Sequence, residues 1–327
     1  MFAHEKSVFI KRLCSCKRRS GASNFTQILC QSARWPIRVM PFSSLITPPT
    51  SILLVDNGSR EPASTLALRG LAVRLTEASG CAVKPVSLLH SSAIDPALLG
   101  GQPAEILEPA LRVLAAEGQL DVVIVPLFFG PSAALQDYVP ERVRHLRQSW
   151  PDLRVRLAPC LVDATRTDDQ RVAAMLVERV RETAVENKFR QPAVAVVDHG
   201  TPQRAVNVVR ELVAAQVREL LGDFARRVAA CSMERRPGME FDFNEPMLET
   251  LLHSNEFSAG EVMVARLFLQ PGRHAGPGGD IEQICAAASV RHPGMKIALT
   301  EPLGSHPGLI PILVERLKEG LAAEPIY

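Results

Sequence analysis

Two histidines and one acidic residue of this 327-residue sequence stand where apolar runs end. His199 follows the run at 193–197, Glu234 follows the run at 227–233, and His274 lies just past the run at 261–269. Two imidazoles and a carboxylate can hold one divalent cation and leave coordination positions open for an incoming ligand. The same groups can also act as general acids and bases. The residue types therefore predict a metal site or an acid–base site.

A glycine-rich segment, 272–279, carries His274. Glycine lets the backbone approach a large flat ligand closely. No Lys-Ser or Lys-Thr pair follows the glycines, which excludes a Walker phosphate loop. The first strand of each half ends in Asn-Gly-Ser or His-Gly-Thr, which excludes a dinucleotide fingerprint.

The sequence repeats itself after residue 190. "LLVDNGS" matches "AVVDHGT" (Asn57 and His199 are 142 positions apart), and "PLFFGP" matches "RLFLQP" at an offset of 140. "RVRLAPCL" matches "KIALTEPL" at an offset of 142. Three matches in the same order at nearly one offset predict an internal duplication.

Short apolar runs alternate with amphipathic segments in both halves, which predicts an α/β fold. The expected strands are 52–55, 83–89, 121–128 and 153–158, then 193–197, 227–233, 261–269 and 296–300. The expected helices are 62–79, 103–117 and 137–149, then 203–222, 246–254 and 279–290. Apolar strands without alternation, separated by helices, indicate small parallel sheets covered on both faces. Ligands of such sheets bind at the carboxyl ends of the strands, where the candidate residues lie.

The domain boundaries predicted from this pattern are a basic leader at 1–50, a first half at 51–185 and a second half at 191–327. The segment 182–192 is the expected joint between the halves. Residues 1–40 hold eight Lys or Arg and one acidic residue, so the rest of the chain carries 29 basic and 34 acidic residues. This balance gives no support for nucleic-acid binding. Translation that starts at Met40 is the preferred interpretation of the leader, and an organelle transit peptide is the alternative.

Apolar runs are far shorter than the roughly 20 residues of a membrane helix, so no membrane span is expected. Seven scattered cysteines, including Cys14, Cys16 and Cys30 of the leader, show no metal-binding spacing. We therefore expect reduced thiols and a cytoplasmic protein.

The segments "VVDHGTP", "SMERRPGMEFDFNEPMLETLL", "LFLQPGRHAGPGGDIEQIC" and "EPLGSHPGL" resemble sirohydrochlorin chelatases of the CbiX/SirB type, in their long, internally duplicated form. The resemblance extends from about residue 51 to residue 321. It implies two tandem class II chelatase-like domains and insertion of Co²⁺ or Fe²⁺ into sirohydrochlorin, a step toward cobalamin or sirohaem. The metal is then a substrate, and no organic cofactor is implied.

The resemblance assigns His199 and His274 to the family's first-strand and third-strand histidines, and Glu234 to the acidic residue of the second strand. Asp242 or Glu245 is an alternative for that acid. The corresponding positions of the first half are Asn57, His90 and Ala134. An amide is no base and alanine no ligand, so the first half is interpreted as a degenerate wall of the cleft.

Sirohydrochlorin carries eight carboxylates, so the resemblance also implies cations around the cleft. The candidates are Arg60, Arg235, Arg236 and Arg273. His306 is expected to be a turn residue, and Asp280 the N-cap of the following helix.

Other interpretations stay open. A non-catalytic protein that carries metal or tetrapyrrole would fit a chain that has lost one histidine set. A hydrolase that uses His199 would need a nucleophile motif, and no Gly-x-Ser-x-Gly is present. The residue types do not distinguish a site for Co²⁺ from one for Fe²⁺ or Ni²⁺, because all three metals accept imidazole and carboxylate ligands. A monomer or weak homo-oligomer is expected, because the duplicated chain can replace a dimer of short halves.

Overall fold

The computed structural model describes residues 50–327 of the chain. The predicted basic leader and its three cysteines lie outside this range.

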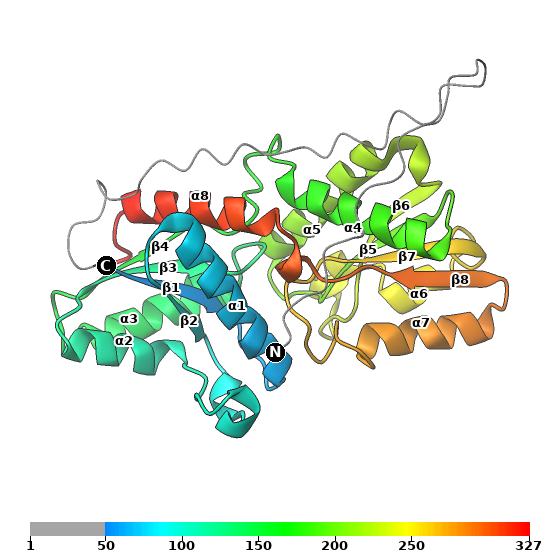
Figure 1. Ribbon diagram of the computed structural model, residues 1–327. Helices are drawn as coiled ribbons and strands as arrows, with labels where there is room; N and C mark the ends of the chain where they lie inside the picture. Colours follow the sequence, from blue (N-terminus) through cyan, green and yellow to red (C-terminus); the bar gives the residue numbers. More distant parts are fainter. Residues whose placement is uncertain (1–49) are drawn as a thin grey trace, which may run out of the picture. The chain divides into compact units, whose positions relative to one another are not determined.

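Two four-stranded parallel sheets form the framework (Figure 1), which confirms the predicted α/β fold. The first sheet has the order β2-β1-β3-β4, with β1 (Thr50–Asp56), β2 (Val83–Ser87), β3 (Asp121–Pro126) and β4 (Arg154–Leu157). The second has the order β6-β5-β7-β8, with β5 (Ala193–Asp198), β6 (Arg227–Ser232), β7 (Gly260–Arg266) and β8 (Met295–Leu299). All pairs are parallel. The repeated strand order agrees with the duplication in the sequence.

The helices that cover the sheets are α1 (Pro62–Ser79), α2 (Leu107–Ala116), α3 (Val139–Leu146), α4 (Arg171–Asn187), α5 (Arg204–Leu221), α6 (Leu248–Leu252), α7 (Asp280–Arg291) and α8 (Leu309–Ala322). The predicted helix 137–149 opens instead with a π turn at Ala134–Tyr138, which α3 continues. Sequence patterns missed α4 and α8. The expected joint at 182–192 is wrong in its first part, because α4 runs through Asn187 and ends at Lys188, whose φ is 58°.

Helices α4 and α8 are exchanged between the halves (Figure 1). Although α4 precedes β5, it packs on β7 and β8, and the last helix α8 returns to β3 and β4 of the first sheet. The approach of α8 is close: a Cβ added at Gly320 would lie 2.7 Å from the Ala158 Cβ. Beyond α8, Ile326 N donates to the Val155 carbonyl oxygen at 2.8 Å. Each sheet is therefore completed by a helix from the other half of the sequence.

Successive side chains of each strand point to opposite faces of the sheet, so the buried residues fall into three cores. Leu54 and Val196, one from each sheet, belong to a core shared with α1, α4, α5 and α8. Val55 faces a second core under α2 and α3, and Val197 faces a third under α6 and α7. These four side chains are fully buried, and each such burial contributes about 1.5–3 kcal/mol. The shared core therefore joins the two sheets through one set of packed side chains.

Across residues 50–327, none of the helices combines the length and the apolar composition that a bilayer span requires.

Candidate functional site

The turn after β5 brings His199 beside Glu234. The Asp198 carboxylate accepts hydrogen bonds from Gly200 N at 3.0 Å and from Ser232 Oγ at 2.7 Å, and Glu234 N donates to the His199 carbonyl at 3.1 Å. Gly200 has a φ of +91°, and a Cβ there would lie 1.8 Å from the Glu234 carbonyl oxygen. Only glycine fits this contact between the two strand ends.

His274 is positioned by the glycine-rich loop between β7 and α7. The loop closes on itself through Gly276 N and the Gly272 carbonyl, which are 2.8 Å apart. Arg266, the last residue of β7, is 5% exposed and its Nη1 donates to the Ala275 carbonyl at 2.6 Å. Burial of a guanidinium is costly unless its donors are satisfied, so this contact fixes the loop to the sheet. These two contacts hold the backbone of the loop that carries His274.

The three predicted site residues meet in pairs. Nε2 of His199 lies 3.3 Å from Nε2 of His274 and 3.4 Å from Oε1 of Glu234. The two rings stand at 75° with centroids 4.6 Å apart. Within residues 50–327, no group of three or more His, Cys, Asp or Glu side chains is arranged to hold a metal ion. The histidine pair is thus the closely arranged part of the site.

The Nδ1 atoms of both imidazoles lie beside oxygen acceptors. Nδ1 of His274 lies 2.5 Å from Oδ2 of Asp280, and Nδ1 of His199 lies 3.1 Å from the Gly200 carbonyl oxygen. A carboxylate and a carbonyl only accept, so a neutral ring that donates to them from Nδ1 carries its lone pair at Nε2. Nitrogens bound to one tetrahedral cation at about 2.0–2.1 Å would be about 3.3–3.4 Å apart. The observed separation matches that spacing.

Asp280 was missed as a site residue. The structure corrects its expected role as an N-cap, because Gly279 is the N-cap of α7 and Asp280 is the first helical residue. Its carboxylate binds His274 instead. The sequence signal was an acidic residue six positions after a histidine, at the end of a glycine-rich loop. Nothing in that spacing distinguishes a helix cap from a histidine partner.

A cavity of about 720 Å³ lies at the histidine pair and is lined by both halves. His199, His274 and Arg273 line it from the second half, and Arg60 and His90 from the first. Volumes of about 300–1,000 Å³ are usual for sites of small organic ligands. Two of the four predicted arginines therefore face the same space as the histidines.

Glu234, Arg235 and Arg236 are exposed and stand outside the lining of this cavity. Arg235 is bound within its own loop, with Nε 2.9 Å from Glu245 Oε1 and Nη1 3.0 Å from Asp242 Oδ1. The two alternative acids thus contact Arg235, whereas Glu234 contacts His199.

A second cavity, of about 240 Å³, adjoins the first along Asn57 and His199. Phe128, Phe129 and Phe268 line it. The site therefore has an apolar side between the halves and a polar side with arginines.

Each half has a buried aspartate at the end of its first strand, Asp56 in β1 and Asp198 in β5, and the two differ in their partners. Burial raises the pKa of Asp198, and hydrogen bonding by Ser232 and the charge of Arg210, 3.8 Å away, oppose this shift. Burial raises the pKa of Asp56 to about 6. Leu68 occupies the position equivalent to Arg210, and Oδ1 of Asp56 has no hydrogen-bond partner. A buried arginine therefore accompanies the aspartate only in the half that carries His199 and His274.

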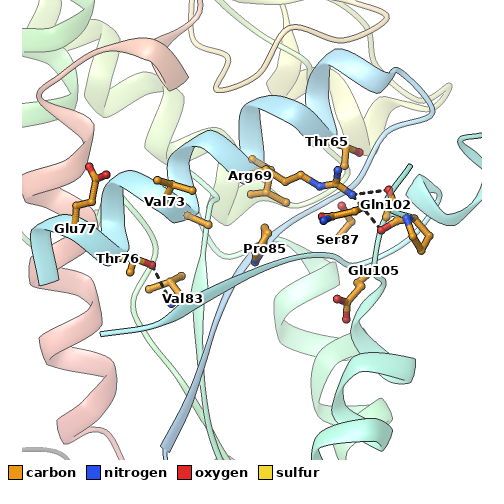
Figure 2. A pocket seen from close by; sticks show the side chains of 14 residues that line it. Thr65, Arg69, Val73, Thr76, Glu77, Val83, Pro85, Ser87, Gln102 and Glu105 are labelled. Atoms are coloured by element: carbon orange, nitrogen blue, oxygen red, sulfur yellow. Dashed lines mark hydrogen bonds between the residues drawn. The ribbon is translucent and has the colours of Figure 1, made fainter. Parts of the chain in front are cut away.

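A larger cavity, of about 960 Å³, lies beside α1 and the edge strand β2 (Figure 2), and neither His199 nor His274 lines it. Among residues 50–327, neither a histidine nor a cysteine lines it, and its one arginine is engaged within the protein: Arg69 donates to the carbonyls of Leu99 and Gln102 at 2.8 Å. We therefore place the candidate site at the histidine pair.

His306 is a structural residue, as expected. It is 3% exposed, and its Nδ1 accepts from Gly308 N at 3.1 Å. Burial lowers its pKa, while Glu178, 3.2 Å from Nε2, opposes the shift.

Two parallel sheets of the same order, with a ligand-sized cavity at their carboxyl ends, define a duplicated α/β protein with one asymmetric site. The chain belongs to the CbiX family, whose model matches residues 51–183 and again residues 193–320. A search of curated proteins finds no match.

Solved structures share the fold. SirB from Bacillus subtilis with Fe³⁺ superposes with a TM-score of 0.63 at 15% identity, covering 84% of this chain and 96% of that one. Sirohydrochlorin chelatase SirB from Bacillus subtilis subspecies spizizenii in complex with cobalt gives 0.61 at 15% identity, over 84% and 95% of the two chains. CbiX, the terminal enzyme for biosynthesis of sirohaem in denitrifying bacteria, gives 0.53 at 17% identity, over 82% and 98%. At these identities the similarity shows the fold alone.

Proposed function

We propose that this protein inserts Co²⁺ or Fe²⁺ into sirohydrochlorin. The observation that carries the proposal is the pair of Nε2 atoms of His199 and His274, 3.3 Å apart, on a cavity lined by both halves. Family membership supports the reaction class, and two of the similar structures named above, both of SirB, contain iron or cobalt. Imidazole nitrogen and carboxylate oxygen are suitable ligands for both metals.

In this proposal the metal is a substrate that the two imidazoles bind first. Both Nδ1 atoms lie beside oxygen acceptors, and a neutral ring that donates to such an acceptor has Nε2 available for the metal. Glu234, 3.4 Å from His199 Nε2, supplies a nearby negative charge that favours a cation. Water or the macrocycle completes the coordination.

The macrocycle binds in the cavity with its carboxylates directed at guanidinium groups. Arg60 and Arg273 line the cavity from opposite halves, and the Arg273 side chain is 78% exposed. Arginine binds carboxylates through two parallel N–H donors, which orients a flat ligand. Arg235 is occupied by Asp242 and Glu245, so its contribution is to hold the loop.

Insertion replaces two pyrrole N–H protons by one divalent metal, so two protons leave. Each of the two imidazoles, once it has released the metal, has a free Nε2 lone pair and accepts one of the two protons from the macrocycle. His199, the more exposed of the two histidines, can pass its proton to solvent.

The test is an anaerobic insertion assay with the full chain, sirohydrochlorin and Co²⁺ or Fe²⁺, followed by the visible spectrum. We expect a rate well above that of metal alone, abolished in His199→Ala and His274→Ala. His253→Ala is the matched control, because His253 pairs with His292 at 2.8 Å, outside the cavity lining. Equal rates with and without protein would reject the proposal. Metal binding by both histidines without turnover would instead indicate a carrier protein.

A further inference from the structure

The two imidazoles of the site are held by partners of different charge. His274 donates to the carboxylate of Asp280 at 2.5 Å, and His199 donates to the neutral carbonyl of Gly200 at 3.1 Å. The His274 side chain is 28% exposed and that of His199 is 47% exposed. The metal-facing nitrogens are alike, but the groups behind them differ.

We infer that Asp280 is a positioning residue that makes His274 the tighter of the two metal ligands and leaves His199 as the ligand that exchanges. The inference rests on the proposed function, because the cation concerned is the metal to be inserted. An anionic partner at Nδ1 stabilises the positive charge that the ring acquires when Nε2 binds a cation. A neutral carbonyl at a longer distance does so less.

The loop geometry fixes Asp280 for this role. Asp280 is the first residue of α7, and Ile281 N donates back to the His274 carbonyl at 3.2 Å. Arg273 Nε lies 3.9 Å from the same carboxylate oxygen that binds His274. The carboxylate is therefore held between a cation and the imidazole, so the His274 ring has a fixed orientation before any metal arrives.

Unequal ligands suit a metal that has to leave the protein. A cation bound equally well by two imidazoles must break two equivalent bonds to reach the macrocycle. With His274 as the anchor, His199 is released first and opens a coordination position on the cavity side, where the ring nitrogen enters. The order of release thus follows from the two Nδ1 partners.

The experiment is a titration of the full chain with Co²⁺ alone, read from the visible absorption of the bound ion. Asp280→Asn should weaken Co²⁺ binding about 10–100-fold. Glu282→Gln is the matched control: Glu282 lies in the same first turn of α7, but it accepts from Gly278 N at 2.7 Å and makes no contact with His274. We expect its effect to stay within about twofold of wild type.

A double-mutant cycle separates positioning from a general charge effect. In the His274→Ala background, Asp280→Asn should change the Co²⁺ affinity by no more than about twofold, because the imidazole that it orients is gone. His274→Ala should also weaken binding more than His199→Ala. An unchanged affinity in Asp280→Asn, an equal loss in both backgrounds, or the reverse order of the two histidines would overturn the inference.

The titration contains no tetrapyrrole, so it is independent of turnover. Wild-type protein that binds Co²⁺ with this dependence on Asp280 but inserts none would refute the proposed function and leave the inference standing. Thermal unfolding of the metal-free variants shows whether a loss of Co²⁺ affinity reflects a loss of fold. If Asp280→Asn is less stable than wild type, the double-mutant cycle still tests whether its effect on affinity requires His274.

Discussion

Asp56, at the end of β1, is expected to reduce stability at neutral pH. It is 6% exposed, its Oδ1 has no hydrogen-bond partner, and burial raises its pKa from 3.8 to about 6. The folded state therefore holds the proton more tightly than the unfolded state between these two values. Under linkage the free energy of unfolding falls as pH rises from about 4 to about 6 and is level above that. The perturbation that tests this is Asp56→Asn.

The magnitude follows from the shift. About two pKa units at 1.36 kcal/mol each correspond to about 3 kcal/mol. An asparagine keeps an oxygen that can accept from Ser87 and Gly58, the two groups that now bind the carboxylate. Asp56→Asn should therefore raise the free energy of unfolding by up to about 3 kcal/mol at pH 7.5, and the gain should shrink toward zero near pH 4.

The assay is urea unfolding of both proteins at pH values from 4 to 7.5, with the difference between them as the readout. Asp198→Asn is the matched comparison, because it removes the same charge in the second half but also removes one of two carboxylates beside the buried Arg210, which then keeps Glu211 at 2.5 Å. Breaking such a pair is destabilising, so this variant should not share the gain. A difference between wild type and Asp56→Asn that is independent of pH would refute the reasoning.

Glycine and cysteine positions give further expected outcomes. Gly200→Ala should lower stability by more than about 2 kcal/mol in urea unfolding, because its Cβ would lie 1.8 Å from the Glu234 carbonyl oxygen. Gly70→Ala should raise it by about 0.5–1 kcal/mol, because Gly70 lies within α1 and a Cβ there meets nothing within 4 Å. Burial raises the pKa of the Cys231 thiol, and it raises the pKa of the Cys285 thiol to about 12. A thiol reagent at pH 8 should therefore label these two cysteines only after denaturant is added. Rapid labelling of the native protein would contradict their burial.

The strands were predictable because their signal is local. A strand buried on both faces is an unbroken apolar run, and β5, fully buried from Ala193 to Asp198, is such a run. The rule that parallel strands present ligands at their carboxyl ends then placed His199 and His274 at one edge of the sheet. Two imidazoles from different loops meet because the sheet brings those loops together.

Other features depend on contacts that a single sequence does not encode locally. An amphipathic pattern shows which face of α8 is apolar, but not that this face covers the first sheet. Arg235 resembled a substrate ligand because it stands at a strand end, yet it pairs with Asp242 and Glu245 ten residues or fewer away. The choice between a helix cap and a histidine partner for Asp280 depends on the loop conformation, which the glycines leave free.

The two halves of the duplication differ in the charges buried at the ends of β1 and β5. Arg210 is 1% exposed, and it contacts Asp198 as well as the carbonyls of Asn244 and Phe243, in the loop that follows Glu234. Burying a guanidinium is costly, and replacing such an ion pair by apolar groups is often neutral or stabilising. The first half carries Asn57 where the second carries His199, and there Leu68 occupies the position equivalent to Arg210. Within residues 50–327, Asp56 is therefore buried with hydrogen bonds from Ser87 and Gly58 but without a neighbouring guanidinium, which is why Asp56→Asn and Asp198→Asn should affect stability differently.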